Sequence, residues 1–311
     1  MNRSQAELPP RQPAQRYRGR FAPSPTGPLH FGSLVAALAS CCDARAAGGE
    51  WLVRIEDVDT PRSCDRVADA ILATLEAYGF EWDGPIVRQS ARTGLYEAAL
   101  DRLAADRRIF ACACTRKELE TAPFGVAGER RYPGTCRAGV PAGRQGRAWR
   151  LIVTDELIGF HDRAQGAQQH RLDRDVGDFI IRRADGMFAY QLAVVVDDAA
   201  QEITHVVRGA DLLASTPRQI WLQRQLGLST PVYLHHPVAI LASGEKLSKQ
   251  TGARPLDDEA DPLPALLRAW DFLAQPQPPE APGSVAEFWQ WTRRAWSSHA
   301  LPPVQMLPVP R

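Results

Sequence analysis

The sequence predicts an α/β protein built on a parallel sheet, with an inserted subdomain and a short helical region near the carboxyl end. Strand-like and helix-like segments alternate over the first 111 residues, an order typical of a doubly wound parallel sheet. From Cys112 to about Arg150 the chain is rich in Gly, Pro, Arg and Cys and has little periodicity. Such a segment cannot easily pack a core unaided, which indicates an insertion stabilised by something else.

The first half begins with a strand that runs through a turn of Pro and Gly into a helix, and the same alternation then repeats. The predicted strands lie at 18–24, 50–57 and 109–111, and the predicted helices at 31–47, 65–78 and 93–105. In the second half we predict strands at 148–154, 178–183, 188–196 and 204–208, and helices at 216–226, 262–272 and 284–299. Residues 234–241 lead into a loop that carries two lysines.

These elements predict a catalytic domain in two halves, 17–111 and 176–254, separated by the insertion with its neighbouring region at 112–175. A helical region at 255–300 follows, between a disordered leader at 1–16 and a Pro-rich tail at 301–311. No apolar stretch reaches the roughly 18 residues needed to span a membrane, and the leader lacks the apolar centre of a signal peptide. We therefore expect a cytoplasmic protein, a monomer, with no membrane partner.

The formal net charge of +1 argues against a protein that coats nucleic acid through its overall potential. Contact with RNA would need a local patch, and six arginines within the insertion form a candidate: Arg130, Arg131, Arg137, Arg144, Arg147 and Arg150. A solvated face in an arginine-rich chain is the alternative.

Lysine is rare in this chain, which contains 34 arginines and three lysines. Two of the lysines, Lys246 and Lys249, lie in one loop at 243–250. A compact ammonium on a flexible stem differs most from the planar guanidinium at a transferring phosphate, so the loop indicates phosphate chemistry. A solvated loop with incidental charges is the alternative.

A second phosphate-binding candidate is the turn at 23–33, where the first strand passes into the first helix. Free N–H groups and the positive end of the helix dipole attract phosphate there, and Gly32 would let a nucleotide approach the backbone. His30 could donate a hydrogen bond to a phosphate oxygen. Taken alone, this turn could equally be an ordinary helix start.

Three cysteines, Cys112, Cys114 and Cys136, fall within 25 residues of the insertion. In a reducing compartment such a cluster favours a tetrahedral metal site over disulfides, with zinc as the ion. No fourth cysteine is near, so Tyr132, Glu129, His161 or water remain candidates for the fourth ligand. We expect one structural Zn²⁺.

Four separated motifs resemble the class I aminoacyl-tRNA synthetases. The segments 30–33 (HFGS) and 246–250 (KLSKQ) resemble the two signature motifs of that class, and the segments 20–27 (RFAPSPTG) and 54–62 (RIEDVDTPR) resemble its glutamyl branch. Ser33 stands where many class I enzymes have a second His, and Gln250 where Ser or Arg is usual. Neither departure removes Lys249, so activity is expected to survive.

The resemblance implies a Rossmann-like catalytic domain that binds ATP with Mg²⁺ and L-glutamate. It implies that His30, Lys246 and Lys249 are catalytic and that ATP is bound by His30, Gly32, Ser33, Lys246 and Lys249. It further implies that glutamate is bound by Arg20, Phe21, Ala22, Pro23, Ser24, Glu56, Tyr190 and Arg208. For the metal it points to Tyr132 as the fourth ligand.

Only 61 residues follow Gln250, too few for the anticodon-binding domain of a full glutamyl-tRNA synthetase. The combination resembles the shortened glutamyl-Q tRNA(Asp) synthetase family, in which glutamate is activated without tRNA and passed to the queuosine base in the tRNA(Asp) anticodon stem-loop. Alternatives are a compact enzyme that charges the 3′ end of tRNA(Glu), glutamylation of a protein or small amine, and an inactive RNA-binding module.

Overall fold

The protein is built around a parallel sheet, as the sequence predicts. The computed structural model describes residues 16–125, 130–241, 243–247 and 254–309. Strand β1 (Arg18–Phe21) pairs in parallel with β2 (Glu50–Ile55), which pairs with the short β3 (Val87–Arg88). On the other side, β9 (His205–Gly209) pairs in parallel with β10 (Val232–His236), and Thr204 N donates to Arg18 O at 2.9 Å. The resulting order β3-β2-β1-β9-β10 is that of a doubly wound fold.

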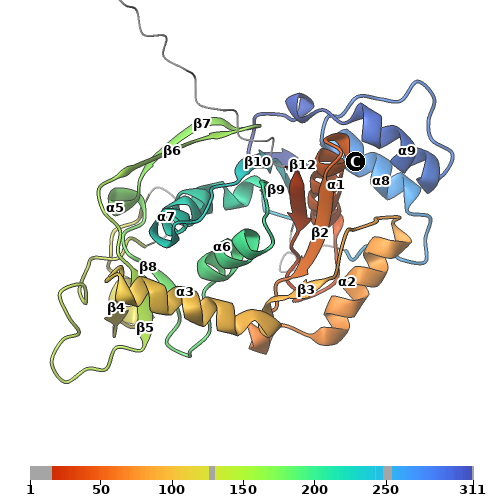
Figure 1. Cartoon of the computed structure of the whole chain (residues 1–311). Coiled ribbons are helices and arrows are strands. Elements are labelled where there is room, and N and C mark those ends of the chain that lie inside the picture. Colours follow the sequence, from red (N-terminus) through yellow and green to blue (C-terminus); the bar gives the residue numbers. More distant parts are fainter. Residues whose placement is uncertain (1–15, 126–129, 242, 248–253, 310–311) are drawn as a thin grey trace, which may run out of the picture.

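Helices cover both faces of this sheet (Figure 1). One face packs against α1 (Phe31–Ala46), α2 (Asp65–Ala77), α8 (Leu263–Phe272) and α9 (Val285–Ala295), and the other against α3 (Thr93–Ala105), α6 (Tyr190–Ala200) and α7 (Thr216–Leu226). Successive residues of β9 belong to opposite hydrophobic cores: Val207 packs with the first set of helices and Val206 with the second. This alternation is the two-residue period of a strand buried on both sides.

Smaller sheets extend the fold. β4 (Ile109–Cys112), β5 (Ala148–Leu151) and β8 (Phe179–Arg182) form an antiparallel sheet at the base of the insertion. β6 (Leu157–Asp162) and β7 (Gly166–Arg171) form a hairpin that joins β10 through β6. β11 (Val238–Ile240) pairs in parallel with β12 (Met306–Pro308), and α4 (Arg116–Leu119) and α5 (Leu172–Asp175) are single turns. The sequence did not predict the hairpin, β3, β12 or the single-turn helices.

The strand predicted at 188–196 is wrong, because residues 190–200 form helix α6. Every residue from Leu192 to Asp198 is buried, so the segment has no polar face to reveal a helical period. Its run of β-branched valines favours a strand by local propensity, and burial between α3 and α7 overrides that preference. The helix predicted at 284–299 ends early, at Ala295, because Trp296 adopts an extended backbone.

Asp43 in α1 joins distant parts of the chain. Its carboxylate accepts hydrogen bonds from Tyr17 Oη at 2.5 Å, from Arg163 Nη1 at 2.6 Å and from Trp296 Nε1 at 2.9 Å. The donors belong to the start of the sheet, the β6–β7 hairpin and the carboxyl-terminal region.

Among the described helices none has the length and apolar character to cross a bilayer.

Candidate active site and metal centre

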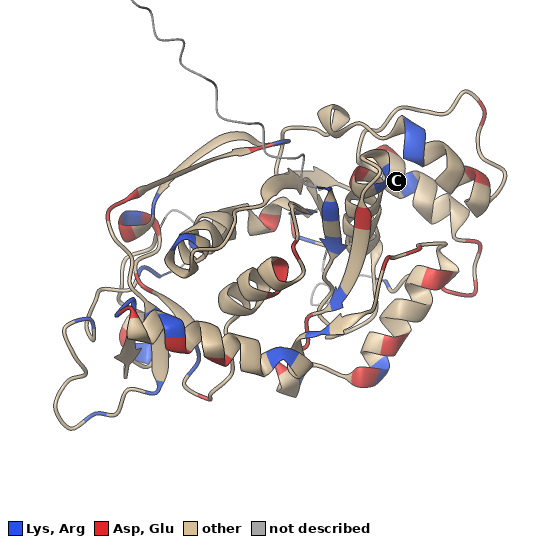
Figure 2. Ribbon diagram, viewed as in Figure 1, with Lys and Arg blue, Asp and Glu red and all other residues tan. Residues whose placement is uncertain are grey.

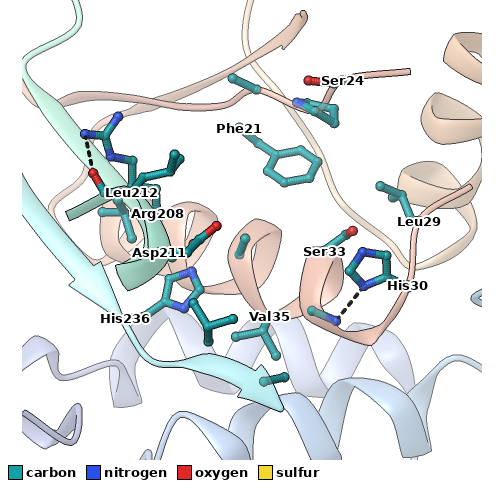
Figure 3. Close-up of a pocket in the computed structure, with 18 of the residues that line it drawn as sticks. Phe21, Ser24, Leu29, His30, Ser33, Val35, Arg208, Asp211, Leu212 and His236 are labelled. Carbon is teal, nitrogen blue, oxygen red and sulfur yellow. Dashed lines mark hydrogen bonds between the residues drawn. The ribbon is translucent and has the colours of Figure 1, made fainter. Parts of the chain in front are cut away.

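A cavity of about 660 Å³ opens where β1, β2, β9 and β10 end and α1 begins. This is the edge at which open α/β sheets bind their ligands. Its lining includes all the described residues that the sequence singled out for nucleotide and glutamate: Arg20, Phe21, Ala22, Pro23, Ser24, His30, Gly32, Ser33, Glu56, Tyr190, Arg208 and Lys246. Figure 3 labels Phe21, Ser24, His30, Ser33 and Arg208 of this set. Lys249 and Gln250 lie outside the described residues.

His30 is the N-cap of α1, and its ring orientation follows from that position. Its Nδ1 accepts a hydrogen bond from Gly32 N at 3.1 Å (Figure 3). An accepting Nδ1 leaves the proton of the neutral ring on Nε2, so His30 is a hydrogen-bond donor on its outer edge. A Cβ on Gly32 would lie 3.1 Å from His30 Cε1, so Gly32 leaves the room that this ring occupies.

The lysine loop turns back toward this helix entrance. Leu241 N donates to Glu245 O at 2.8 Å and Leu247 N to Ala239 O at 2.9 Å, around a left-handed Gly244 with a φ of 85°. Lys246 Nζ lies 2.6 Å from Asp211 Oδ2, just beyond the end of β9. The loop therefore brings an ammonium group to the wall of the cavity.

Two buried charged side chains of the cavity lining, Arg20 and Glu56, belong to a network of buried charges. Asp198 of α6 accepts from Arg20 Nε at 3.1 Å and from Arg54 Nη2 at 2.7 Å. Arg54 Nη2 also lies 3.4 Å from Glu56 Oε1. In Figure 2 the acidic end of α6 faces the basic residues of β1 and β2. Burial raises the pKa of Glu56, and the guanidinium groups of Arg54 and Arg20 only partly oppose this rise.

Arg208 of β9 differs from Arg20 and Arg54 because no carboxylate of the described residues pairs with it. Its Nε donates to His235 Nε2 at 3.0 Å, and its Nη2 to Thr216 Oγ1 and Gln219 Oε1 at 2.9 and 2.8 Å. Its Nη1 has a long contact of 3.5 Å with Tyr190 Oη. A buried guanidinium whose partners are all neutral is costly, and binding of an anion would lower that cost.

Sequence reasoning did not identify Asp198, and it included Arg54 only as part of the 54–62 motif. Arg54 and Asp198 are separated by 144 positions, so only the fold reveals that they pair. One signal was available: Asp197 and Asp198 are adjacent carboxylates directly after a valine run. Charges inside an apolar segment require partners, which makes them candidates for a buried network.

The insertion gathers the predicted metal ligands. The sulfur atoms of Cys112, Cys114 and Cys136 lie within 4.8 Å of one another, with 3.6 Å between Cys114 Sγ and Cys136 Sγ. Tyr132 Oη is 3.5 Å from Cys112 Sγ and 3.6 Å from Cys114 Sγ. Zinc–sulfur bonds of about 2.3 Å would place tetrahedral ligands roughly 3.7 Å apart, so the four atoms fit that ion.

Two neighbours complete this cluster. Cys136 N donates to Tyr132 Oη at 2.8 Å, and Arg150 Nε donates to Cys112 Sγ at 3.3 Å. Although burial opposes it, hydrogen bonds from Tyr132 and Arg150 lower the pKa of the Cys112 thiol, which favours the thiolate form that binds metal. His161 lies in the β6–β7 hairpin and is not among the clustered ligands of the described chain; Glu129 lies outside it.

Arg150 does not belong to the arginine patch in which the sequence placed it. The side chain is buried, its guanidinium stacks 3.8 Å from the centre of the Tyr132 ring, and Nη1 donates to Asp178 O at 2.8 Å. Other arginines of the insertion are spaced along its long exposed loop (Figure 2). Of these, Arg144 is paired with Glu118 at 2.6 Å.

Comparison with known proteins gives consistent relatives. A family model described as tRNA synthetases class I (E and Q), catalytic domain, matches residues 16–274. The Glutamyl-Q tRNA(Asp) synthetase of Dechloromonas aromatica (strain RCB) is 58% identical over 298 residues, which cover 94% of this chain and 98% of that protein. The Glutamyl-Q tRNA(Asp) synthetase of Chromobacterium violaceum is 55% identical over 293 residues, covering 93% and 97%.

Solved structures support the fold. The glutamate-tRNA synthetase of Elizabethkingia anophelis superposes with a TM-score of 0.78 at 24% identity, covering 94% of this chain and 68% of that chain. A glutamate tRNA ligase from Elizabethkingia meningosepticum, solved with its amino acid, gives a TM-score of 0.77 at 23% identity, covering 95% and 67%. The predicted parallel-sheet fold of class I synthetases is confirmed.

The raised pKa of Glu56 predicts a stability cost at the site. A carboxyl whose pKa is higher in the folded protein stabilises the fold below its unfolded pKa, about 4.3 for Glu, and loses that contribution as pH rises through the folded value. Glu56→Gln should therefore be more stable than the parent protein at pH 8, and the difference should disappear near pH 4. Urea unfolding at several pH values measures it. A Glu56→Gln variant less stable at pH 8 than at pH 4, relative to the parent, would contradict the assignment.

Proposed function

Because the chain belongs to the class I tRNA synthetases of the E and Q group, and within it to the glutamyl-Q tRNA(Asp) synthetase family, we propose that it activates L-glutamate with ATP and transfers glutamate to tRNA(Asp). The acceptor is the queuosine base of the anticodon loop. The observation that carries the activation step is one cavity that combines a helix entrance suited to phosphate with a buried cation that no carboxylate of the described residues neutralises.

Activation joins the two ends of the cavity. The α-carboxylate of glutamate attacks the α-phosphorus of ATP in line, a carboxylate oxygen–phosphorus bond forms, and the bond to the bridging oxygen breaks to release pyrophosphate. The nucleophile is already an anion, so the protein contributes position and charge stabilisation. His30, through its Nε2, acts on one side of the phosphates, and Lys246 with Lys249 acts on the other. Mg²⁺ accompanies ATP and shields its charge.

Glutamate recognition uses groups of opposite charge. Arg208 presents Nη1 beside the Tyr190 hydroxyl, which suits the side-chain carboxylate of the substrate. Glu56, as the carboxylate, pairs with the substrate ammonium. An uncharged amide in place of the carboxylate would leave Arg208 poorly paired in a buried site, which disfavours glutamine.

The insertion, in this proposal, is held by one structural Zn²⁺ on Cys112, Cys114, Cys136 and Tyr132. A zinc ion supplies cross-linking to a segment with a very small core of its own. Burial raises the pKa of the Tyr132 phenol, and only the charge of a metal would make phenolate binding favourable. Free thiols at these positions also favour a reducing cytoplasm, and we propose that the protein works there as a monomer.

The acceptor RNA is supported by identity to relatives over nearly their full length, and by exposed arginines along the insertion. These arginines could contact the phosphates of an anticodon stem-loop. A compact enzyme charging the 3′ end of tRNA(Glu) is the second candidate, because the fold matches full-length glutamate-tRNA synthetases.

Lys249→Ala should lower glutamate-dependent ATP–pyrophosphate exchange by about 10²-fold or more, because one charge-stabilising donor would be lost. The exchange is measured without RNA. The matched control is Lys117→Ala, which removes the third lysine, in α4 of the insertion, and should change the rate by less than about twofold. Equal losses in both variants would argue against a specific role for Lys249.

The acceptor is tested with radiolabelled glutamate, ATP and purified tRNAs. Label should be transferred to tRNA(Asp) that contains queuosine, and neither to the same tRNA without queuosine nor to tRNA(Glu). Label on tRNA(Glu) alone would favour the second candidate. A well-folded sample that shows no ATP–pyrophosphate exchange at all would instead favour an inactive RNA-binding module.

The metal proposal predicts one zinc per chain in purified protein, measured by atomic absorption. Cys114→Ser should lose most of this zinc, whereas Cys64→Ser, which changes an exposed thiol outside the cluster, should retain it. Tyr132→Phe should retain zinc but release it faster to a chelator, because one of four ligands is absent. Release at the parental rate would remove Tyr132 from the ligand set.

A further inference from the structure

Asp162 and His235 lie behind Arg208 and do not line the cavity. They sit at adjacent strand positions: Arg208 in β9 is the register partner of His235 in β10, and Tyr233 of β10 is the partner of Asp162 in β6. Both His235 and Asp162 are completely buried. We propose that this pair is a positioning device that fixes the orientation of Arg208, and thereby the affinity for the substrate carboxylate.

The direction of the hydrogen bonds fixes the protonation of His235. Its Nδ1 lies 2.6 Å from Asp162 Oδ2, and a carboxylate can only accept, so Nδ1 carries the proton. Asp162 is held as the carboxylate because its Oδ1 accepts from the backbone N of Ala164, Gln165 and His235 at 3.0, 2.9 and 3.1 Å. His235 Nε2 is therefore an unprotonated acceptor, and it faces Arg208 Nε at 3.0 Å and Thr216 Oγ1 at 3.3 Å.

This acceptor determines which edge of Arg208 meets the ligand. Nε and Nη2 are both occupied by protein groups, His235 on one and Thr216 with Gln219 on the other, and Leu212 O lies 3.5 Å from Nη2 (Figure 3). Only Nη1 remains, next to Tyr190 on the cavity wall. Hydrogen bonds at Nε and Nη2 thus fix the orientation of the guanidinium plane, and Nη1 faces the position proposed for the substrate carboxylate.

The neutral imidazole of His235 also preserves the positive charge of Arg208. A carboxylate in direct contact with Arg208 would satisfy it and weaken its attraction for a substrate anion. Placing a neutral imidazole between Asp162 and Arg208 orients the guanidinium by a hydrogen bond and keeps the anion one ring away. Arg20, by comparison, contacts Asp198 directly, which makes it a less suitable partner for the substrate carboxylate.

The inference rests on the proposed function, and two replacements of His235 test it. His235→Gln retains a side-chain acceptor near the position of Nε2, whereas His235→Asn reaches only the position of Nδ1 and Asp162. His235→Asn should raise KM for L-glutamate in ATP–pyrophosphate exchange by about 10- to 100-fold, the cost of one misplaced charge-assisted hydrogen bond. His235→Gln should stay within about threefold of the parent, and KM for ATP and kcat should change little in both.

Equilibrium dialysis with radiolabelled L-glutamate gives a second readout that needs no chemistry, and the same order of affinities is expected. Ser40→Ala is the control for loss of a buried hydrogen bond elsewhere, since Ser40 Oγ accepts from Trp51 Nε1 at 3.0 Å and Ser40 does not line the cavity. Equal glutamate affinity in His235→Asn and His235→Gln would overturn the proposed role of His235. A loss of ATP affinity as large as the loss of glutamate affinity would also overturn it. A parent protein that neither binds glutamate nor exchanges pyrophosphate would instead overturn the proposed function.

Should both His235 variants fail to fold, Asp162→Asn carries the same test with almost no change of shape. An amide nitrogen at the position of Oδ2 would donate to His235 Nδ1, so the ring proton would move to Nε2 and oppose Arg208 Nε–H. KM for L-glutamate should again rise about 10-fold or more, with KM for ATP unchanged. An unchanged glutamate KM in a folded Asp162→Asn protein would overturn the proposal.

Discussion

The arrangement of the site depends on the ion pairs between Asp198 and the arginines of the two central strands. Arg20 of β1 and Arg54 of β2 both reach one carboxylate on α6, at 3.1 and 2.7 Å. These contacts hold α6 against the sheet at the level where the strands end. Because α6 also begins with Tyr190, the same interaction sets the distance between Tyr190 and the residues that follow β1. Removing one of these charged side chains would leave another charge buried and unpaired. The loss of folding free energy would be far larger than for a surface ion pair.

Local sequence signals were enough to predict the parallel sheet, the entrance of α1 and the lysine loop. Pro and Gly around His30 mark a turn, and the rarity of lysine marks the loop, so neither required knowledge of the fold. The valine-rich segment of α6 was misassigned because a fully buried helix has no polar face and its β-branched residues favour a strand. The β6–β7 hairpin escaped prediction because β7 is a polar edge strand with few apolar residues.

The candidate site was predictable where its residues fall in motifs, and not where they act through space. Arg208 and Tyr190 were identified by resemblance, yet Arg54, Asp198 and His235 became visible only when segments distant in sequence met at the sheet. The metal cluster shows the same contrast: its thiols are obvious from spacing, while Arg150 was assigned to an exposed patch and is instead packed on Tyr132. Buried charges require partners, but a sequence does not identify which ones.

The pairing of β12 with β11 links the last described strand of the chain to the wall of the cavity. β11 leads directly into the turn that carries Lys246, and its outer edge is covered by residues 306–308. Removing residues 306–308 would therefore uncover the edge of β11 beside the turn that carries Lys246.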